Sequence, residues 1–364
     1  MARRDPQIVA ALCRWFDREA RDLPWRRRRT GYTALVAEAM LQQTQVSRVL
    51  QRYAAFVRRF PTAGALAAAD EQEVLALWQG LGYYRRARLL HGAAKLITRL
   101  YGGRVPRDVA ELVNLPGVGR YTAAAIASIV YGKREPAVDG NTQRVLARLD
   151  ANDGPPMDRR TISRAWERAA DLVACAAEPG TLNEALMELG ALVCTPQKPR
   201  CGLCPLTSQC RALGQGRQDL IPPPRPAARK KQVHHHAVVI FRGRAPTVLF
   251  EQRPANGMWS RLWQVPTIEA PRRLHVRAVK DALPVPVTGL TLRGSFEHQT
   301  THRRITFHVY TAGSRWGKGR WRRLDDTEDL PMSNAQRKVL QRAMRTSASP
   351  PTRRPLQPAA ARGS

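Results

Sequence analysis

Four cysteines are the residues with the clearest capacity for chemistry in this chain. Cys194, Cys201, Cys204 and Cys210 are spaced C-x6-C-x2-C-x5-C within seventeen residues. Four thiolates held by short loops can bind a tetrahedral metal ion or an iron–sulfur cluster. Structural zinc sites usually have two C-x2-C pairs, and this sequence has one, so the spacing favours a 4Fe–4S cluster. Two disulfides of a secreted domain are the alternative, but the opening Met-Ala-Arg-Arg-Asp lacks the apolar core of a signal peptide.

Two acidic residues have neighbours that suit them to acid–base chemistry. Glu38 is the only charged residue between positions 32 and 46, and alanines flank it in an apolar helical stretch. Burial in such a stretch raises the pKa of a carboxyl group and keeps its proton available near neutral pH. Asp139 lies in a loop before a helical segment, where its ordinary role is to cap the helix. A protonated acid and an ionised carboxylate together can cleave a bond to a sugar carbon.

A glycine-rich hairpin is predicted at 115–123, Leu-Pro-Gly-Val-Gly-Arg-Tyr-Thr-Ala. Gly117 and Gly119 allow a tight turn between a helical segment and an alanine-rich helix. Backbone N–H groups at such a helix N-terminus can approach a phosphate, and the helix dipole adds attraction. A plain turn between packed helices is the alternative. The segment Ala-Val-Asp-Gly-Asn that begins twenty residues after Gly117 favours the helix-hairpin-helix interpretation.

Two domains are needed to position these residues. From Ile8 to about Ala212, apolar residues recur at spacings of three and four, and Pro or Gly ends most segments. A basic, proline-rich stretch follows, and strands are predicted after it at 237–241, 247–251 and 304–310. The predicted organisation is an all-α domain at 1–213, a stiff linker at 214–233 with histidines 234–236 at its basic end, an α+β domain at 234–345 and a disordered tail at 346–364.

The charge of the chain indicates a polyanionic partner. Lys and Arg number 60 against 29 acidic residues, which gives a formal net charge of +31 among 364 residues. Such a field favours nucleic acid or an anionic membrane surface. No apolar run approaches the length that crosses a bilayer, so nucleic acid is the first choice. A GC-rich genome would also raise the arginine content by itself, so charge alone supports DNA or RNA binding without proving it.

Taken in order, the motifs resemble those of MutY-type adenine DNA glycosylases, helix-hairpin-helix repair enzymes of the endonuclease III superfamily. The resemblance covers about residues 5–212, and the set of motifs is highly specific. The C-terminal half resembles the Nudix-like domain of that family more loosely, and it lacks the acidic box that would bind magnesium for hydrolysis. The matching segments are Leu23-Pro-Trp-Arg26, 38–46, Gly80-Leu-Gly-Tyr-Tyr84, 115–123, Val138-Asp-Gly-Asn141, Met187-Glu-Leu-Gly190, the four cysteines and, in the C-terminal half, 252–259 and 262–266.

The resemblance implies a role for each matching residue. Glu38 would donate a proton toward N7 of a flipped adenine, Asp139 would stabilise the deoxyribosyl cation and help bring in water, and Asn141 would orient the site. Tyr121 occupies the position of the Schiff-base lysine in bifunctional relatives, and a tyrosine cannot form that imine, so a monofunctional enzyme is expected. The adenine pocket would consist of Arg21, Trp25, Arg26, Leu41, Val46 and Glu188, for which core packing and a structural ion pair are the alternatives.

Further residues would contact the DNA. Gln43 and Tyr83 match residues that wedge into the duplex around the lesion, since extruding a base leaves a gap to fill. A buried amide and simple packing are the alternatives for these two residues. Gly117 and Gly119 would meet the phosphate backbone, and the cluster would hold a basic loop with Lys198 and Arg200 against it. The loop that senses 8-oxoguanine corresponds to 300–302, where Thr301 and His302 would contact the lesion, although the aromatic residue of the family is missing.

The sequence thus predicts an all-α helix-hairpin-helix glycosylase core with one 4Fe–4S cluster, followed by an α+β Nudix-like domain. The predicted activity is monofunctional excision of adenine opposite 8-oxoguanine or guanine. A bifunctional or pyrimidine-directed relative, or a non-catalytic DNA-binding iron–sulfur protein, is the alternative. The expected partner is double-stranded DNA with an adenine mispair and no membrane, and the expected state is a monomer in the bacterial cytoplasm, associated with the nucleoid.

Overall fold

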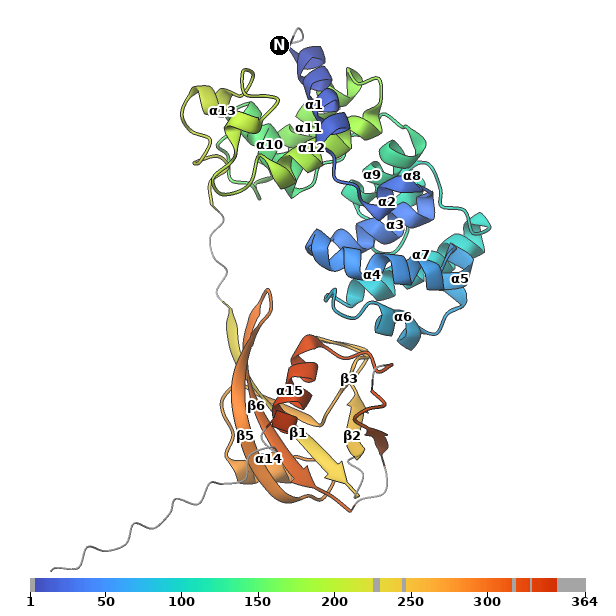
Figure 1. Cartoon of the computed structure of the whole chain (residues 1–364), viewed down its shortest axis with the longest axis vertical. Coiled ribbons are helices and arrows are strands. Elements are labelled where there is room, and N and C mark those ends of the chain that lie inside the picture. The colour runs from blue at the N-terminus through green and yellow to red at the C-terminus, as the bar shows by residue number, and fades with distance from the viewer. Residues whose placement is uncertain (1–3, 225–229, 244–246, 316–318, 328, 346–364) are drawn as a thin grey trace, which may run out of the picture. The chain divides into compact units, whose positions relative to one another are not determined.

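The computed structural model describes residues 4–224, 230–243, 247–315, 319–327 and 329–345, which belong to two compact units, 1–227 and 228–364 (Figure 1). The first unit is helical. Its elements are α1 Asp5–Glu19, α2 Pro24–Arg27, α3 Gly31–Leu41, α4 Val46–Arg59, α5 Ala63–Ala68, α6 Glu71–Leu77, α7 Arg85–Tyr101, α8 Val109–Leu112, α9 Arg120–Tyr131, α10 Gly140–Leu149, α11 Arg159–Ala174, α12 Pro179–Leu192, the 3-10 turn Cys201–Leu203 and α13 Arg211–Gly214.

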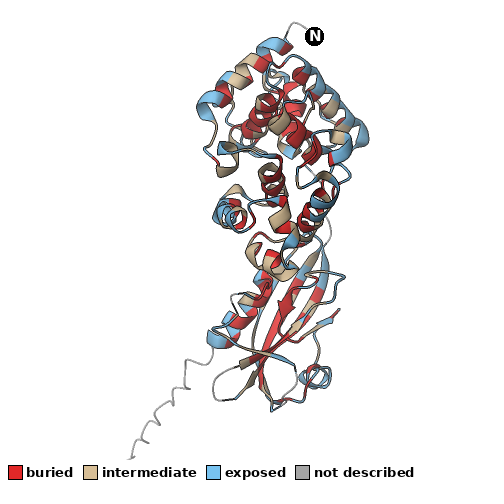
Figure 2. Cartoon of the chain, turned by 90° about the vertical axis from the view of Figure 1, so that its right-hand side faces the viewer, coloured by how far each residue is buried: buried red, intermediate tan, exposed pale blue. Residues whose placement is uncertain are grey.

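The helices of the first unit gather into two lobes. Helix α1 packs with α10, α11 and α12 in one lobe, while α3 packs with α4, α7 and α9 in the other. The contact between α9 and α12 joins the lobes. Buried residues face the interior of each lobe and exposed residues cover the outer faces, which is the amphipathic pattern expected of surface helices (Figure 2).

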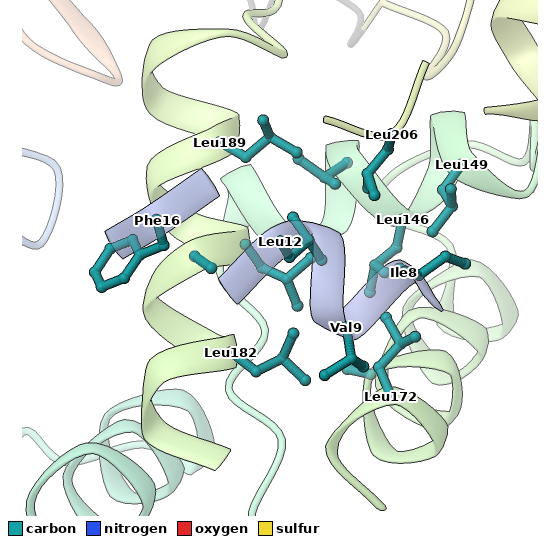
Figure 3. Close-up of a cluster of buried hydrophobic side chains, with 14 of the residues drawn as sticks. Ile8, Val9, Leu12, Phe16, Leu146, Leu149, Leu172, Leu182, Leu189 and Leu206 are labelled. Carbon is teal, nitrogen blue, oxygen red and sulfur yellow. The ribbon is translucent and has the colours of Figure 1, made fainter. Parts of the chain in front are cut away.

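Helix α1 anchors the first lobe although it is far in sequence from its neighbours. Leu12 is fully buried at the centre of an apolar cluster that α1, α10, α11 and α12 share (Figure 3). Burying a leucine side chain of this kind contributes about 2 kcal/mol through the area removed from water. The labelled members in Figure 3 are Ile8, Val9, Leu12, Phe16, Leu146, Leu149, Leu172, Leu182, Leu189 and Leu206.

Side chains at helix starts fix the segments that carry the predicted acids. The hydroxyl of Thr30 caps α3 by accepting a hydrogen bond from the backbone N–H of Thr33. In turn, the hydroxyl of Thr33 accepts one from the backbone N–H of Thr30. Asp139 caps α10 by accepting from the N–H of Thr142 at 2.7 Å. Such caps satisfy backbone donors that have no partner within the helix. The caps therefore fix locally where α3, which carries Glu38 in its last turns, and α10, which Asp139 caps, begin.

The predicted glycine hairpin connects α8 to α9. Gly117 has φ +80°, a left-handed conformation that favours glycine, and a Cβ there would lie 2.8 Å from the Cβ of Leu89. Gly119 is the N-cap of α9 and provides no side-chain cap for the N–H groups that follow. Both glycines are exposed. The first turn of α9 thus presents backbone donors on the surface of the hairpin.

The second unit is a mixed sheet with a helix on each face. Strands β3 Trp263–Gln264, β2 Thr247–Gln252, β1 Lys231–Arg242, β6 Arg303–Gly313 and β5 Thr288–Gln299 follow in that order, with β4 Thr267–Ala270 beside β1 and β7 Arg320–Arg323 beside β2. Strand β1 runs parallel to β6 and antiparallel to β2 and β4. Helix α15, Asn334–Arg345, packs on one face with Val239 and Phe307, and α14, Val276–Asp281, packs on the other with Val238 and Tyr310.

The strands predicted at 237–241, 247–251 and 304–310 are confirmed as parts of β1, β2 and β6. The predicted linker at 214–233 is wrong at both ends. Ile221 is buried in the helical unit beside Ala147, and β1 begins at Lys231. The interpretation of 234–236 as a linker end is also wrong, because β1 contains these histidines and buries His235 and His236. The predicted tail at 346–364 lies outside the described residues.

The histidines at 234–236 belong to the sheet because their rings pack against the aromatic rings of neighbouring residues. His236 stacks on His308 with ring centroids 4.8 Å apart, and burial lowers the pKa of His236 to about 4.

Within the part of the chain that the structure describes, no helix combines the length and the apolar character needed to cross a membrane.

Candidate active site and iron–sulfur loop

Every residue predicted for catalysis or for the adenine pocket lines a single cavity in the helical unit. The cavity has a volume of about 540 Å³ and lies between the helices of the two lobes. Its size suits a nucleobase-sized ligand, since ligand pockets usually measure some 300–1,000 Å³. The predicted residues that line it are Arg21, Trp25, Arg26, Glu38, Leu41, Gln43, Val46, Tyr121, Asp139, Asn141 and Glu188.

Glu38 enters the cavity from the last turns of α3. Its helix is apolar and buries Leu35, Val36 and Met40, which leaves the carboxyl group as the polar end of an apolar wall. Burial raises the pKa of Glu38 from 4.5 to about 7, and the negative charges of Asp139 and Glu184 add to that rise. A hydrogen bond from Tyr121 acts in the opposite direction. Glu38 can therefore hold a proton near neutral pH, as its sequence context predicts.

Tyr121 lies against Glu38 from the first turn of α9. Burial raises the pKa of Tyr121 well above its usual value, and the neighbouring carboxyl groups of Glu38 and Asp139 reinforce the effect. The phenol remains a hydrogen-bond donor, and its oxygen also lies 3.4 Å from the sulfur of Met187. Among the residues described as lining the cavity there is no lysine. This wall therefore offers proton donors and no amine nucleophile.

Asp139 enters the cavity from the N-terminus of α10. One carboxylate oxygen accepts from the N–H of Thr142, and the other accepts from the side-chain amide of Asn141 at 3.0 Å. These two bonds fix the orientation of a carboxylate that remains partly exposed to the cavity. The capping role that the sequence predicts is thus compatible with a second role at the cavity wall.

The opposite wall is an ion-pair network on α12. Glu188 is buried, and both of its oxygens accept hydrogen bonds from Arg21 and from Arg26. Burial alone would raise the pKa of Glu188, but these hydrogen bonds lower it to about 2. Glu184, one helical turn earlier, pairs with Arg26 at 3.0 Å and with Arg29 at 2.7 Å. Arg21, Arg26 and Glu188 therefore line the cavity while they also form a structural ion-pair network.

The apolar part of the cavity comes from α2 to α4. Trp25 packs edge-on against Tyr53 with ring centroids 5.4 Å apart, and it keeps one side toward the cavity. Leu41 and Val46 flank the loop between α3 and α4, and both are partly exposed rather than buried in a core. An aromatic ring with two aliphatic side chains forms a wall against which a flat base can stack.

Gln43 and Tyr83 lie on two neighbouring loops at the surface. Gln43 is exposed at the rim of the cavity, with φ 54°, and Tyr83 is 50% exposed, with φ 47°. Gln43 is therefore not a buried amide, and that alternative is wrong, whereas simple packing beside Trp78 stays an alternative for the half-exposed Tyr83. Thr301 and His302 lie in the second unit, exposed in the turn between β5 and β6. Their predicted contact with a lesion stays a prediction.

Sequence reasoning missed several residues that hold the cavity together. Arg144 donates to the side-chain oxygen of Asn141 at 2.8 Å and to the carbonyls of Gly190 and Cys194 at 2.8 Å. Asn183 is fully buried and binds the chain just before Asp139, through the N–H of Ala137 and the carbonyl of Glu135. Glu184 could have been found, because it stands four residues before Glu188 and so on the same helix face.

The four cysteines occupy the loop between α12 and α13. All four are free and partly buried, and each of Cys201, Cys204 and Cys210 lies close enough to other members of the set for their charges to interact. Burial raises the pKa of Cys204 to about 12, so the thiolate form needs a positively charged partner. No three ligand side chains among the described residues meet at a single-ion position. A cubane cluster requires no such meeting, because each thiolate binds a different iron.

Arg148 of α10 holds the cysteine loop to the helical unit. Its guanidinium donates to the sulfur of Cys194 at 3.3 Å and to the carbonyls of Thr195 and Ile221 at 2.7 Å. The side chain is 2% exposed. Cationic donors beside a thiolate stabilise its negative charge, so this donor set fits an iron–sulfur cluster.

Comparison with known proteins agrees with this geometry. Residues 36–170 match the HhH-GPD superfamily of base excision DNA repair proteins, residues 194–210 match the iron–sulfur binding domain of endonuclease III, and residues 236–342 match the NUDIX domain. The adenine DNA glycosylase of Rattus norvegicus is 36% identical over 90% of this chain and 76% of its own length. That of Mycolicibacterium smegmatis is 48% identical over 55% of this chain and 67% of its own.

The chain belongs to the adenine DNA glycosylase family.

Membership confirms the predicted fold class, the enzyme class and the 4Fe–4S cluster, and it makes DNA the substrate. Adenine DNA glycosylases share their helical fold with other repair enzymes. A thermostable thymine-DNA glycosylase aligns with a TM-score of 0.54 at 28% identity, over 58% of this chain and 98% of that one. An endonuclease III bound to DNA aligns with a TM-score of 0.50 at 24% identity, over 60% of this chain and 98% of that one, which shows the fold alone.

Proposed function

We propose that the protein removes adenine from double-stranded DNA where it is mispaired with 8-oxoguanine or guanine, and leaves an abasic site. The observation that carries this proposal is the pairing of two carboxyl groups across one base-sized cavity. Glu38 comes from α3 with a pKa of about 7, and Asp139 comes from α10 as an anchored carboxylate. One group that can give a proton and one that can face a cation are what cleavage of a glycosidic bond requires.

The reaction begins with a flipped adenine in the cavity. The carboxyl group of Glu38 donates its proton to N7 of the base, which turns the leaving group from an anion into a neutral purine. The bond between C1′ and N9 breaks with its electron pair going to the base. The negative charge of Asp139 stabilises the oxocarbenium-like sugar that remains. Water then adds to C1′ and gives up a proton, so that free adenine and an abasic site are the products.

No lysine is among the described residues that line the cavity, which supports a monofunctional reaction. A bifunctional glycosylase forms an imine between a lysine and C1′, and Tyr121 occupies the position where the resemblance expects that lysine. The hydroxyl of Tyr121 instead binds Glu38, where it holds the carboxyl group in the cavity. The side-chain amide of Asn141 likewise donates a hydrogen bond to Asp139 and holds its carboxylate in place.

The remainder of the cavity suits the shape and edge of adenine. Trp25, Leu41 and Val46 form a wall against which the base stacks. Arg21 and Arg26 take their positions from Glu188, whose oxygens their guanidinium groups already occupy. Glu188 therefore contributes by fixing the arginines that face the base rather than by accepting a bond from it.

Duplex binding relies on groups that read no sequence. Backbone N–H groups after Gly119 would bind one phosphate, and Lys198 and Arg200 of the cysteine loop would bind others. Cys194, Cys201, Cys204 and Cys210 would hold the cluster, which would cross-link that loop. Gln43 and Tyr83 would fill the gap left by the flipped base.

Thr301 and His302 would contact 8-oxoguanine from the Nudix-like unit. We propose that the protein acts as a monomer at the nucleoid of a bacterium.

The test uses purified full-length protein and a duplex with one adenine opposite 8-oxoguanine. We expect strand scission only after hot alkali, and none with Asp139→Asn. Borohydride should trap no covalent complex. Scission without alkali, or trapping, would indicate a bifunctional enzyme, and excision of a pyrimidine instead would indicate the pyrimidine-directed alternative. Tight duplex binding with no excision of any base would contradict the proposed activity.

A further inference from the structure

We propose that Arg86 is a positioning residue that holds Gln43 and Tyr83 in the conformation in which they enter the duplex. The inference rests on the proposed function, in which these two residues fill the gap beside a flipped adenine. It concerns a residue outside the cavity, on the second position of α7.

Arg86 connects the two loops through its guanidinium group alone. One terminal nitrogen donates to the carbonyls of Ala39, Met40 and Gln42, where α3 ends. The other donates to the hydroxyl of Thr44 at 2.8 Å and to the carbonyls of Leu81 and Gly82 at 3.3 and 3.1 Å. The side chain is 9% exposed, so these bonds compete little with water.

The two carbonyls that matter most immediately precede the predicted wedges. Arg86 binds the carbonyl of Gln42, next to Gln43, and the carbonyl of Gly82, next to Tyr83. Gln43 and Tyr83 both have left-handed backbones, with φ 54° and 47°. Residues other than glycine adopt this conformation at a cost in free energy and keep it only where the surroundings enforce it. A single guanidinium group thus enforces both conformations at once.

The face of the guanidinium group also supports one wedge directly. Its central carbon lies 5.4 Å from the ring centroid of Tyr83 and 5.5 Å from that of Trp78. Burial lowers the pKa of Arg86 to about 10, which still leaves the group charged at neutral pH. A cation against two aromatic faces fixes the Tyr83 ring while half of its surface remains exposed.

Lysine cannot replace arginine in this role. An ammonium group has three donors at one point, whereas the bonds to the two loops leave from two separate nitrogens in a rigid plane. Arg86→Lys therefore keeps the positive charge but, with a shorter side chain and one nitrogen, separates the loops. We expect the loss to fall on base extrusion, and the chemistry at Glu38 and Asp139 to be unchanged once the base is in the cavity.

The experiment compares Arg86→Lys with the matched control Arg85→Lys, which changes an exposed neighbour in the same helix. Single-turnover excision is measured on a duplex with adenine opposite 8-oxoguanine, and on a duplex in which the target adenine is extrahelical. Extrusion is followed separately by the fluorescence of 2-aminopurine at the target position. We expect Arg86→Lys to slow excision at least tenfold on the paired duplex and less than threefold on the extrahelical one, with a matching loss of fluorescence change.

A second comparison separates positioning from general destabilisation. In a Gln43→Ala, Tyr83→Ala background the wedges are gone, so adding Arg86→Lys should cost less than threefold. Thr44→Val, which removes one acceptor of the network, should show the same pattern as Arg86→Lys with a smaller loss. Cluster absorbance and melting temperature report whether each variant has folded.

An equal loss on both duplexes, or an equal loss with and without the wedges, would overturn the inference. So would excision by Arg86→Lys at the rate of Arg85→Lys. These outcomes are distinct from failure of the proposed function, in which the unaltered protein itself would excise no adenine.

Discussion

The two walls of the cavity shift the pKa of a glutamate in opposite directions. Glu38, on the apolar wall of α3, lies beside other acids with some exposure to the cavity, and desolvation raises its pKa to about 7. Glu188, on the wall of α12, is buried but accepts hydrogen bonds from two arginines, and its pKa falls to about 2. Desolvation acts on both carboxyl groups, so their partners decide the direction of the pKa shift. One glutamate can therefore hold a proton near neutral pH, and the other stays an anion that orders Arg21 and Arg26 in the cavity wall.

The largest expected effect comes from removing the acid of the first wall. Glu38→Gln keeps the shape and a hydrogen bond for Tyr121 but has no proton to donate to the base. We expect the single-turnover excision rate to fall by about 10³-fold, within the range typical of a lost general acid. The melting temperature should stay the same or rise, because a buried ionisable group has been replaced by a neutral one. Excision within threefold of the unaltered protein would remove Glu38 from the mechanism.

The corresponding change on the second wall should act on stability first. Glu188→Gln leaves Arg21 and Arg26 without their shared carboxylate, and breaking a buried pair from one side costs about 3 kcal/mol. Chemical denaturation should show this loss at pH 7, together with weaker excision. The stabilisation by Glu188 is present above its unfolded pKa near 4.5 and is lost as the pH falls toward 2. Unchanged stability at pH 7 would mean that the network does not hold the wall.

A smaller effect is expected at the connection between the walls. Asn183 of α12 binds the chain that leads to Asp139 through Ala137 and Glu135, and also receives support from Ser128. Asn183→Ala leaves buried backbone groups unpaired, at a cost of about 2 kcal/mol. We expect excision to slow about tenfold, because a small displacement of Asp139 weakens its contact with the cation. Thr181→Ala, at the start of the same helix, is the control, and an equal effect from it would refute a specific role for Asn183.

The residues of the first wall could be predicted from the sequence, and those that support it could not. Glu38 stands out because it is a lone charge in an apolar helix, and the cysteines stand out by spacing. Arg86 and Arg144 are two of many arginines, and only their burial and long-range partners distinguish them. Such partners are brought together by tertiary packing, which leaves no local pattern in the sequence. Glu184 is intermediate, since its spacing from Glu188 was visible but its pairing was not.

In the Nudix-like unit, too, local sequence predicted only part of the strand structure. The apolar runs of β1, β2 and β6 predicted those strands, but the start of β1 was missed because Lys231 and the histidines after Val233 look like linker residues. Their backbones complete the parallel pairing with β6, where Lys231 lies opposite Arg303 and His235 opposite Phe307. Pairing over this length is a property of the sheet and outweighs the local preference of each residue.

The most direct test of the account is the pH dependence of excision by the unaltered protein. The second-order rate constant reports the ionisation of the free enzyme, so it should fall as the pH rises through about 7, by about tenfold per unit above that value. The fall should disappear in Glu38→Gln, whose residual rate should be flat over the same interval. A rate constant that stays level to pH 9 in the unaltered protein would contradict the claim that the first wall of the cavity supplies the proton.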